Sequence, residues 1–167
     1  MTKQEKEKLK ELVPKIIQWA TDRDLTETEG QYKKFVEEIG ETADAYNHNK
    51  SGELKTDGIG DTFVTICNSA NTLGLVKWIY TAIDSDLETG REMAYYMADI
   101  NLSMSELMLA KENNRGEFCT VQVYNAINNL IGMCETYQLN VLNCVTDAYN
   151  VIKERTGSKR NGVYVKD

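Results

Sequence analysis

Residues 37–61 read EEIGETADAYNHNKSGELKTDGIGD, a run with acidic side chains at both ends and mostly polar residues between them. At the first end, Glu41 follows Glu37 by four positions and Glu38 by three. At the second end, Asp61 follows Asp57 by four. Such spacings place side chains on one face of an α-helix. The run therefore predicts a helical hairpin with an acidic face on each arm.

This acidic hairpin is a candidate metal site, because like charges at helical spacing destabilise a helix and a cation would neutralise them. Carboxylates are the ligands that Mg²⁺ and Mn²⁺ prefer. We expect the metal ligands to be Glu38, Glu41 and Asp61, with Asp57 as a fourth, and the catalytic residues to be Glu37 and Glu38. Glu37 is either a ligand or the base that orients an attacking water. Two plainer interpretations stay open: a solvated acidic helix face, and Asp57 as a helix N-cap.

Apolar residues recur at helical spacing along nearly the whole chain. The segments with this pattern are 5–20, 31–47, 57–74, about 87–112, 119–137 and 139–156. Pro14 predicts a kink or a late helix start, and Gly74 predicts a helix end. The basic tail has the composition of a turn with a short extended piece. The whole pattern predicts an all-α bundle of about five or six helices, one domain over 1–167, built around the hairpin 31–74 and closed by a C-terminal helix and tail, 139–167.

Composition sets limits on class and location. The chain has 167 residues, of which 41% are hydrophobic, enough for one domain with a core. Its net charge of −7 argues against nucleic acid as a partner, because nucleic-acid binders carry a basic field. No apolar run approaches the roughly 20 residues of a membrane helix, and the charged N-terminus has no secretory signal. We therefore expect a cytoplasmic protein without membrane association.

The cysteines and the histidine disfavour two other kinds of metal site. Four cysteines are present, none in a CxxC pair, and His48 is the one histidine in the sequence. This set supports a structural zinc site poorly. A carboxylate-bridged di-iron bundle needs Glu-x-x-His pairs on two helices, which the sequence lacks. We expect the cysteines to be small core residues with reduced thiols.

A faint internal repeat is also present. Residues 41–75 can be laid over 106–139, so that Lys50-Ser51-Gly52-Glu53 meets Asn114-Arg115-Gly116-Glu117 and Asp61 falls on Asn125. The second copy has lost most of its acids. We interpret the pair as two related helical hairpins, the second over 96–139, with only the first equipped for metal. The plainer alternative is that any two amphipathic hairpins align this well.

The acidic residues resemble the signature of a known superfamily, the MazG-like, all-α nucleoside triphosphate pyrophosphohydrolases. These proteins carry EExxE and, after a loop, ExxD, and they include the dimeric dUTPases, the dCTPases and the phosphoribosyl-ATP pyrophosphohydrolases. The first element is matched by Glu37, Glu38 and Glu41, and the closing Asp of the second by Asp61. Gly58 stands where the family has Glu, and Asp57 is the candidate substitute.

Flanking residues extend the resemblance. The sequence IQWATDRDL at 17–25 is similar to the WAxDRxL opening of phage-type members, and Gln31 and Lys34 match the QxxK that precedes EExxE. Asn68 matches a residue common in the family. The ending, AYNVIKERTG at 148–157 and the final NGVYVKD, resembles that of phage and prophage members. The middle of the chain, 76–146, carries no motif of this kind.

The resemblance implies a function, a cofactor and an assembly. Members of the family cleave a nucleoside triphosphate between its α- and β-phosphates in a Mg²⁺-dependent reaction that gives a monophosphate and pyrophosphate. Their subunits pack through these helices, which implies a homodimer or a larger homo-oligomer. The preferred base stays open among dUTP, dCTP, a damaged nucleotide and a broad house-cleaning activity.

The candidate substrate-binding residues lie on four of the predicted helices and are Gln31, Lys34, Asn68, Asn150, Lys153, Arg155 and Trp19. Lys34 precedes Glu38 by one helical turn, and Lys153 and Arg155 would reach the distal phosphates from the last helix. Asn150 would bond phosphate or sugar, and Trp19 would stack on a base. Four of them also have a plainer interpretation: Lys34 as a surface charge, Lys153 and Arg155 as helix-end cations, and Trp19 as a core or interface aromatic.

Two other functions stay open. The first is a catalytically weakened homologue that binds nucleotides or a protein partner, which is favoured by Gly58 at a ligand position. The second is a purely structural helical protein. Metal-dependent release of pyrophosphate would separate the enzyme from both.

Overall fold

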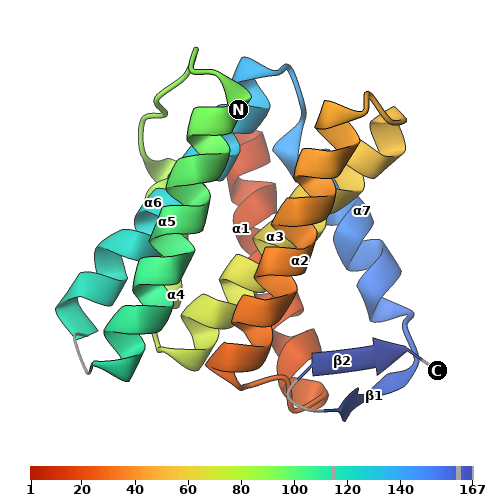
Figure 1. Ribbon diagram of the computed structural model, residues 1–167, viewed down its shortest axis with the longest axis vertical. Coiled ribbons are helices and arrows are strands. Elements are labelled where there is room, and N and C mark those ends of the chain that lie inside the picture. The colour runs from red at the N-terminus through yellow and green to blue at the C-terminus, as the bar shows by residue number, and fades with distance from the viewer. Residues whose placement is uncertain (114–115, 161–162, 167) are drawn as a thin grey trace.

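Helices make up most of the molecule (Figure 1). A computed structural model describes residues 1–113, 116–160 and 163–166, and these form seven helices and one small antiparallel sheet. The elements are α1 (Lys3–Asp22), α2 (Thr28–Asn47), α3 (Gly52–Thr72), α4 (Val76–Asp84), α5 (Met93–Glu112), α6 (Gly116–Thr136), α7 (Val141–Lys153), β1 (Gly157–Arg160) and β2 (Val163–Lys166). The predicted all-α class is confirmed.

One helix, α4, is missing from the sequence prediction, so the described residues hold seven helices instead of five or six. It is only nine residues long and follows Gly74 closely, so its apolar pattern is too short to stand out. Its Ile79, Ala82 and Ile83 are completely buried. Packing against α6 and α1 therefore stabilises this helix more than intrinsic propensity does.

The start of α1 is set by a capping box. The side chain of Thr2 accepts from the backbone N–H of Glu5, and the Glu5 carboxylate accepts from the backbone N–H of Thr2. The helix therefore begins at Lys3 and runs through Pro14. The predicted late start is wrong, because the cap forms well before the proline.

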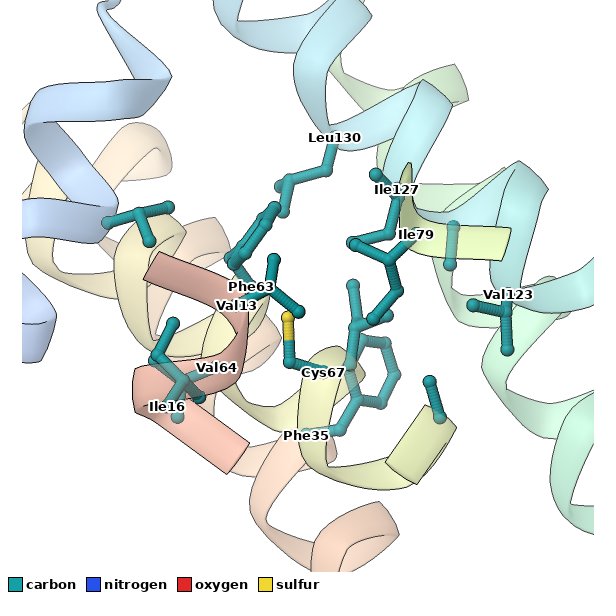
Figure 2. Packing of buried hydrophobic residues seen from close by; sticks show 14 of the residues in the cluster. Val13, Ile16, Phe35, Phe63, Val64, Cys67, Ile79, Val123, Ile127 and Leu130 are labelled. Carbon is teal, nitrogen blue, oxygen red and sulfur yellow. The ribbon is translucent and has the colours of Figure 1, made fainter. Parts of the chain in front are cut away.

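The central element is α3, which contacts α1, α2, α4, α6 and α7. Its residues from Gly58 to Ala70 are all buried. The side chains that meet in the core come from all seven described helices, and those labelled in Figure 2 are Val13, Ile16, Phe35, Phe63, Val64, Cys67, Ile79, Val123, Ile127 and Leu130. The polar side of α3 is therefore not a solvated face.

The ends of α3 are set by Ser51 and Gly74. The Ser51 side chain accepts from the backbone N–H of Leu54 and caps the helix. Asp57 lies inside the helix, so the interpretation of Asp57 as an N-cap is wrong. Gly74 has a φ of +69° just beyond the helix, which confirms the predicted helix end.

Two glycines let neighbouring helices approach α3 closely. A Cβ on Gly58 would lie 2.4 Å from Thr42 Oγ1 of α2, and a Cβ on Gly60 would lie 2.3 Å from the backbone carbonyl oxygen of Cys144 in α7. Glycine in a helix interior costs roughly 0.5–1 kcal/mol relative to alanine. Close helix packing on both sides of the Asp57–Asp61 segment is the physical reason for these two residues.

The predicted second hairpin corresponds to α5 and α6, which lie side by side (Figure 1). Asn114 and Arg115, which the repeat aligns with Lys50 and Ser51, lie outside the described residues. At the other end of the chain, β1 and β2 pair antiparallel, with Gly157 opposite Lys166. The extended piece predicted for the tail is thus a two-stranded hairpin; residues 161–162 and 167 are not among those described.

All four cysteine thiols are reduced and buried, as the sequence predicted. Burial raises the pKa of Cys144 to about 11 and raises those of the other three as well. None of the helices in the described part of the chain has the length and apolar character needed to cross a bilayer.

Candidate functional site

A pocket of about 190 Å³ lies where α2, α3 and the end of α7 meet the C-terminal hairpin and the end of α1. Its lining residues come from five parts of the chain and are Trp19, Leu25, Gln31, Lys34, Glu37, Glu38, Glu41, Asp57, Asp61, Val64, Thr65, Asn68, Ile152, Arg155 and Tyr164. All five acids singled out in the sequence line this one pocket.

The acids divide into an inner pair and an outer group. Glu38 and Asp61 are buried, with 6% and 9% of their surface exposed. Glu37, Glu41 and Asp57 are exposed at the rim. Burying a carboxylate is costly unless a partner compensates the charge, so the inner pair identifies where a cation is most needed.

Two basic side chains face the inner pair. The Lys34 ammonium lies 2.7 Å from Glu38 Oε1 and 2.9 Å from Glu37 Oε1. Arg155 Nη2 lies 3.8 Å from Asp61 Oδ2. Positive charge therefore reaches the acids from α2 and from the segment after α7. The predicted contacts of these two residues with phosphate stay a prediction.

The inner acids hold their protons more tightly than usual. Burial, together with repulsion from Glu38, raises the pKa of Asp61 from 3.8 to about 7, although Arg155 opposes the shift. Burial also raises the pKa of Glu38, and the ion pair with Lys34 offsets part of this shift. Burial by itself lowers the pKa of Lys34, but hydrogen bonds to Glu38 and Glu37 outweigh it and the pKa is raised. The ion pair therefore determines the direction of the shift at Lys34, whereas burial determines it at Glu38.

The lining of the pocket also includes apolar and aromatic side chains. Trp19 packs edge-on against Tyr164 of β2, with ring centroids 5.5 Å apart. Several buried polar atoms of the lining residues have no hydrogen-bond partner among the described residues: Trp19 Nε1, Asn68 Oδ1, Arg155 Nε and Tyr164 Oη. Such atoms are rare in folded proteins. They are consistent with a ligand that supplies both donors and acceptors.

The structure separates two predicted residues from the rest. Asn150 is exposed on α7, where its side-chain oxygen accepts from Lys153 Nζ at 2.9 Å. Neither residue lines the pocket. They lie on α7, which ends two residues before Arg155, and Lys153 borders a separate surface hollow beside Trp19 and Tyr149.

Five lining residues were not predicted from the sequence: Leu25, Val64, Thr65, Ile152 and Tyr164. Four of them are ordinary core or helix residues with no signal of their own. Tyr164 belongs to the tail segment that matched the phage-type ending, which was the one available signal. Its position depends on the fold of β2 against α2.

The donor set suits a hard cation, although the acids do not converge on one point. Every candidate ligand is a carboxylate, which is the oxygen chemistry that Mg²⁺ and Mn²⁺ prefer. Among the described residues, however, no three Asp, Glu, His or Cys side chains are grouped closely enough to hold one ion. Lys34 and Arg155 occupy part of the charge-balancing role instead.

Gly58 stands where the resemblance places a glutamate ligand, and the structure gives a steric reason. Any side chain there would meet Thr42 of α2, beginning with the Cβ at 2.4 Å from Thr42 Oγ1. Asp57 is one position earlier and does line the pocket. The hairpin therefore has room for the acid at 57 and none at 58.

Comparison with known proteins gives one partial similarity. Over 61 residues the chain is 41% identical to an uncharacterized 18.2 kDa protein from the rep-hol intergenic region of Haemophilus phage HP1, covering 35% of this chain and 37% of that protein. The chain thus matches little more than a third of that protein's length. No protein-family model matches the chain, and no solved structure matches it significantly. The similarity to a phage protein accords with the phage-type character of the sequence motifs.

Proposed function

We propose that the protein is a Mg²⁺-dependent nucleoside triphosphate pyrophosphohydrolase, which converts a (deoxy)nucleoside triphosphate and water to the monophosphate and pyrophosphate. The observation that carries the proposal is the pocket whose lining combines five carboxylates and two basic residues with apolar and aromatic side chains. A nucleoside triphosphate has matching parts, a highly charged phosphate chain and a flat base.

The acids would hold the metal, which is Mg²⁺ or, in its place, Mn²⁺. Glu38, Glu41 and Asp61 are the ligands proposed, with Asp57 in place of the missing acid at 58. A metal bound there would supply charge compensation for the phosphates and a lowered pKa for a bound water. The raised pKa values of Glu38 and Asp61 support a site in which added positive charge would be favourable.

The other lining residues have distinct roles in the proposal. Glu37 is exposed at the rim beside Lys34, and it would accept the proton of the attacking water. Lys34 and Arg155 would contact phosphate oxygens. Trp19 and Tyr164 would face the base. Asn68 Oδ1 is buried and has no hydrogen-bond partner among the described residues, so it could accept a hydrogen bond from the edge of the base.

The test is a product assay on a panel of NTPs and dNTPs, with and without Mg²⁺ or Mn²⁺. We expect metal-dependent formation of monophosphate and pyrophosphate in equal amounts. Glu38→Gln should lower the rate by about 100-fold or more, the upper end of the effect of perturbing a metal's surroundings. Glu11→Gln, an exposed acid on α1, is the matched control and should leave the rate unchanged.

The alternative proposal is a weakened homologue that binds nucleotides or a protein partner without turnover, and Gly58 favours it. Calorimetry with Mn²⁺ separates the outcomes. Metal binding that is lost in Glu38→Gln, without turnover of any nucleotide, would support the binding homologue. The absence of both metal binding and turnover would exclude both proposals.

A further inference from the structure

A second polar pocket lies between α5 and α6, about 420 Å³ in volume, and it is separate from the acidic one. The residues that matter to the inference are Asp99, Ser103, Glu106, Gln122, Asn125 and Asn129. The resemblance and the proposed reaction make no use of this part of the chain.

The second pocket is lined by positions of α5 and α6 that the internal repeat aligns with positions of α2 and α3 lining the acidic pocket. The repeat that lays Glu41 over Glu106, continued towards the N-terminus without a gap, pairs lining positions of α2 with lining positions of α5. These pairs are Lys34 with Asp99, Glu37 with Leu102, Glu38 with Ser103, and Glu41 with Glu106. Every one of these α5 residues lines the second pocket.

The second helix of each hairpin shows the same correspondence. The register that places Asp61 on Asn125 also places Val64 on Asn128 and Thr65 on Asn129, and all six residues line their pockets. If the two hairpins shared only their amphipathic character, we would not expect aligned positions to line a pocket in both. The two pockets are therefore equivalent sites with different chemistry.

The chemistry of the second pocket is that of neutral hydrogen bonding. Gln122 and Ser103 each expose only 4% of their surface, and no hydrogen bond joins either side chain to another residue that the structure describes. Their polar atoms are not among the enclosed ones, so they remain accessible from the pocket that both residues line. The Asn125 amide and the Glu106 carboxylate likewise face the pocket without a bond to another described side chain.

The electrostatics exclude a phosphate ligand here. The one basic lining residue, Arg91, is held by Asp99 at 2.6 Å and by Asn129 Oδ1 at 3.3 Å. The remaining acids leave the lining with net negative charge. An anion would be repelled, whereas an uncharged ligand would not.

We propose that this second pocket binds an uncharged nucleoside whose base carries an exocyclic amino group, such as adenosine or cytidine. Side-chain amides pair with base edges that present a donor beside an acceptor, and a carboxylate accepts from an exocyclic amino group. Gln122 and Asn125 supply the amides and Glu106 the carboxylate, while Tyr124 offers a ring to the base. The inference does not depend on the reaction proposed for the first pocket.

The test uses NMR of the full chain in metal-free buffer, titrated with adenosine, cytidine, uridine and AMP. We expect the side-chain amide signals of Gln122 and Asn125 to shift with adenosine or cytidine. Uridine, which lacks the amino group, should bind about tenfold more weakly, since one lost hydrogen bond is worth about a factor of ten. AMP keeps the amino group but should also bind more weakly than adenosine, because the negatively charged lining repels its phosphate.

Variants locate the binding. Gln122→Leu should weaken binding by about tenfold or more, while Asn68→Ala in the first pocket should leave it unchanged. If Gln122→Leu does not fold, the partly exposed Asn125→Leu serves the same purpose. Shifts confined to Gln31 and Asn68, unchanged affinity in the folded variant, or no shift at millimolar nucleoside would each overturn the proposal.

Discussion

Among single residues, the two glycines of α3 are where small changes should be felt most. Gly58 and Gly60 lie between the acids of the pocket, and each has a neighbouring helix within the space that a methyl group would fill. The geometry of Asp57 and Asp61 thus depends on the absence of side chains at the positions between them.

Gly60→Ala should lower the free energy of unfolding by about 1–3 kcal/mol, because its Cβ would lie 2.3 Å from a backbone oxygen of α7 that cannot rotate away. The matched control is Gly40→Ala on α2, where nothing lies within 4 Å of the new methyl group. That variant should gain about 0.5–1 kcal/mol. Urea unfolding of both proteins is the measurement, and equal stabilities would contradict the packing argument.

The raised pKa of Asp61 has a consequence for stability. The folded protein keeps this proton up to about pH 7, whereas the ordinary value for the unfolded chain is 3.8. Between these values the folded state binds more protons, so the free energy of unfolding should fall as the pH rises, by something on the order of 2 kcal/mol. Glu38, whose pKa is also raised, adds in the same direction.

Urea unfolding at pH 5 and pH 7.5 in chelator would measure this loss. Asp61→Asn should flatten the pH dependence, while Glu11→Gln should keep it. Excess Mg²⁺ should also flatten it if a cation enters the pocket. A stability that rises between the two pH values would contradict a raised pKa for Asp61.

At this scale the sequence predicted which acids share a site and could not predict how each is buried. Spacing along a helix is local, so Glu37, Glu38 and Glu41 could be grouped directly. The burial of Glu38 and Asp61, and the arrival of Tyr164 beside Trp19, depend on contacts between distant segments. Asn150 and Lys153 show the converse, because a matching motif did not settle which face of α7 they occupy.

At the scale of elements, the helices were predictable where an apolar stripe ran for several turns. The hairpin arms α2 and α3 were found with ends within a few residues, except that the first turn of α3 was missed because Gly52, Lys55 and Thr56 have a loop-like composition. The short α4 was missed for a different reason, since its order comes from tertiary packing.

The C-terminal hairpin should matter to ligand binding more than to folding. Tyr164 forms one wall of the pocket, and Lys159 ties β1 to Asp24 at 3.0 Å and Glu27 at 2.8 Å through exposed ion pairs. Exposed pairs contribute only about 0–1 kcal/mol each. Removal of residues 157–167 should leave the helical circular dichroism intact.

The same truncation should raise the KM for nucleotide by about tenfold, the equivalent of one lost aromatic contact. Lys159→Ala, which removes the ion pairs and keeps Tyr164, is the control and should have a nearly normal KM. An unchanged KM in the truncated protein would place the base elsewhere in the pocket.

At the scale of the whole molecule, the two hairpins share one core. The buried cluster runs from Leu9 in α1 to Ile152 in α7 without a break between α3 and α6. A shared core predicts cooperative unfolding of both halves in one transition.

The two tryptophans allow this to be measured, because Trp19 lies in α1 and Trp78 in α4. Single-tryptophan variants, Trp19→Phe and Trp78→Phe, should each show the same urea midpoint by fluorescence as by circular dichroism. Two separate midpoints in one variant would mean that the hairpins unfold independently.

The homodimer or larger oligomer implied by the resemblance stays a prediction. α5 presents Tyr95, Leu102 and Leu109 with 59%, 55% and 56% of their surface exposed, at a regular seven-residue spacing along the helix. Light scattering with Leu109→Glu against wild type measures the state. A wild-type monomer at micromolar concentration would contradict the expectation.

The buried cysteines make it possible to measure how often the folded protein opens transiently. One thiol lies in α3, two in α6 and one in α7, so together they sample both hairpins and the last helix. A thiol reagent can modify them only when the surrounding helices separate, because the protonated, enclosed sulfur is a poor nucleophile. The number of adducts gained per molecule over time, counted by mass spectrometry, therefore records whether opening events involve one segment or the whole chain, without any probe having to be introduced.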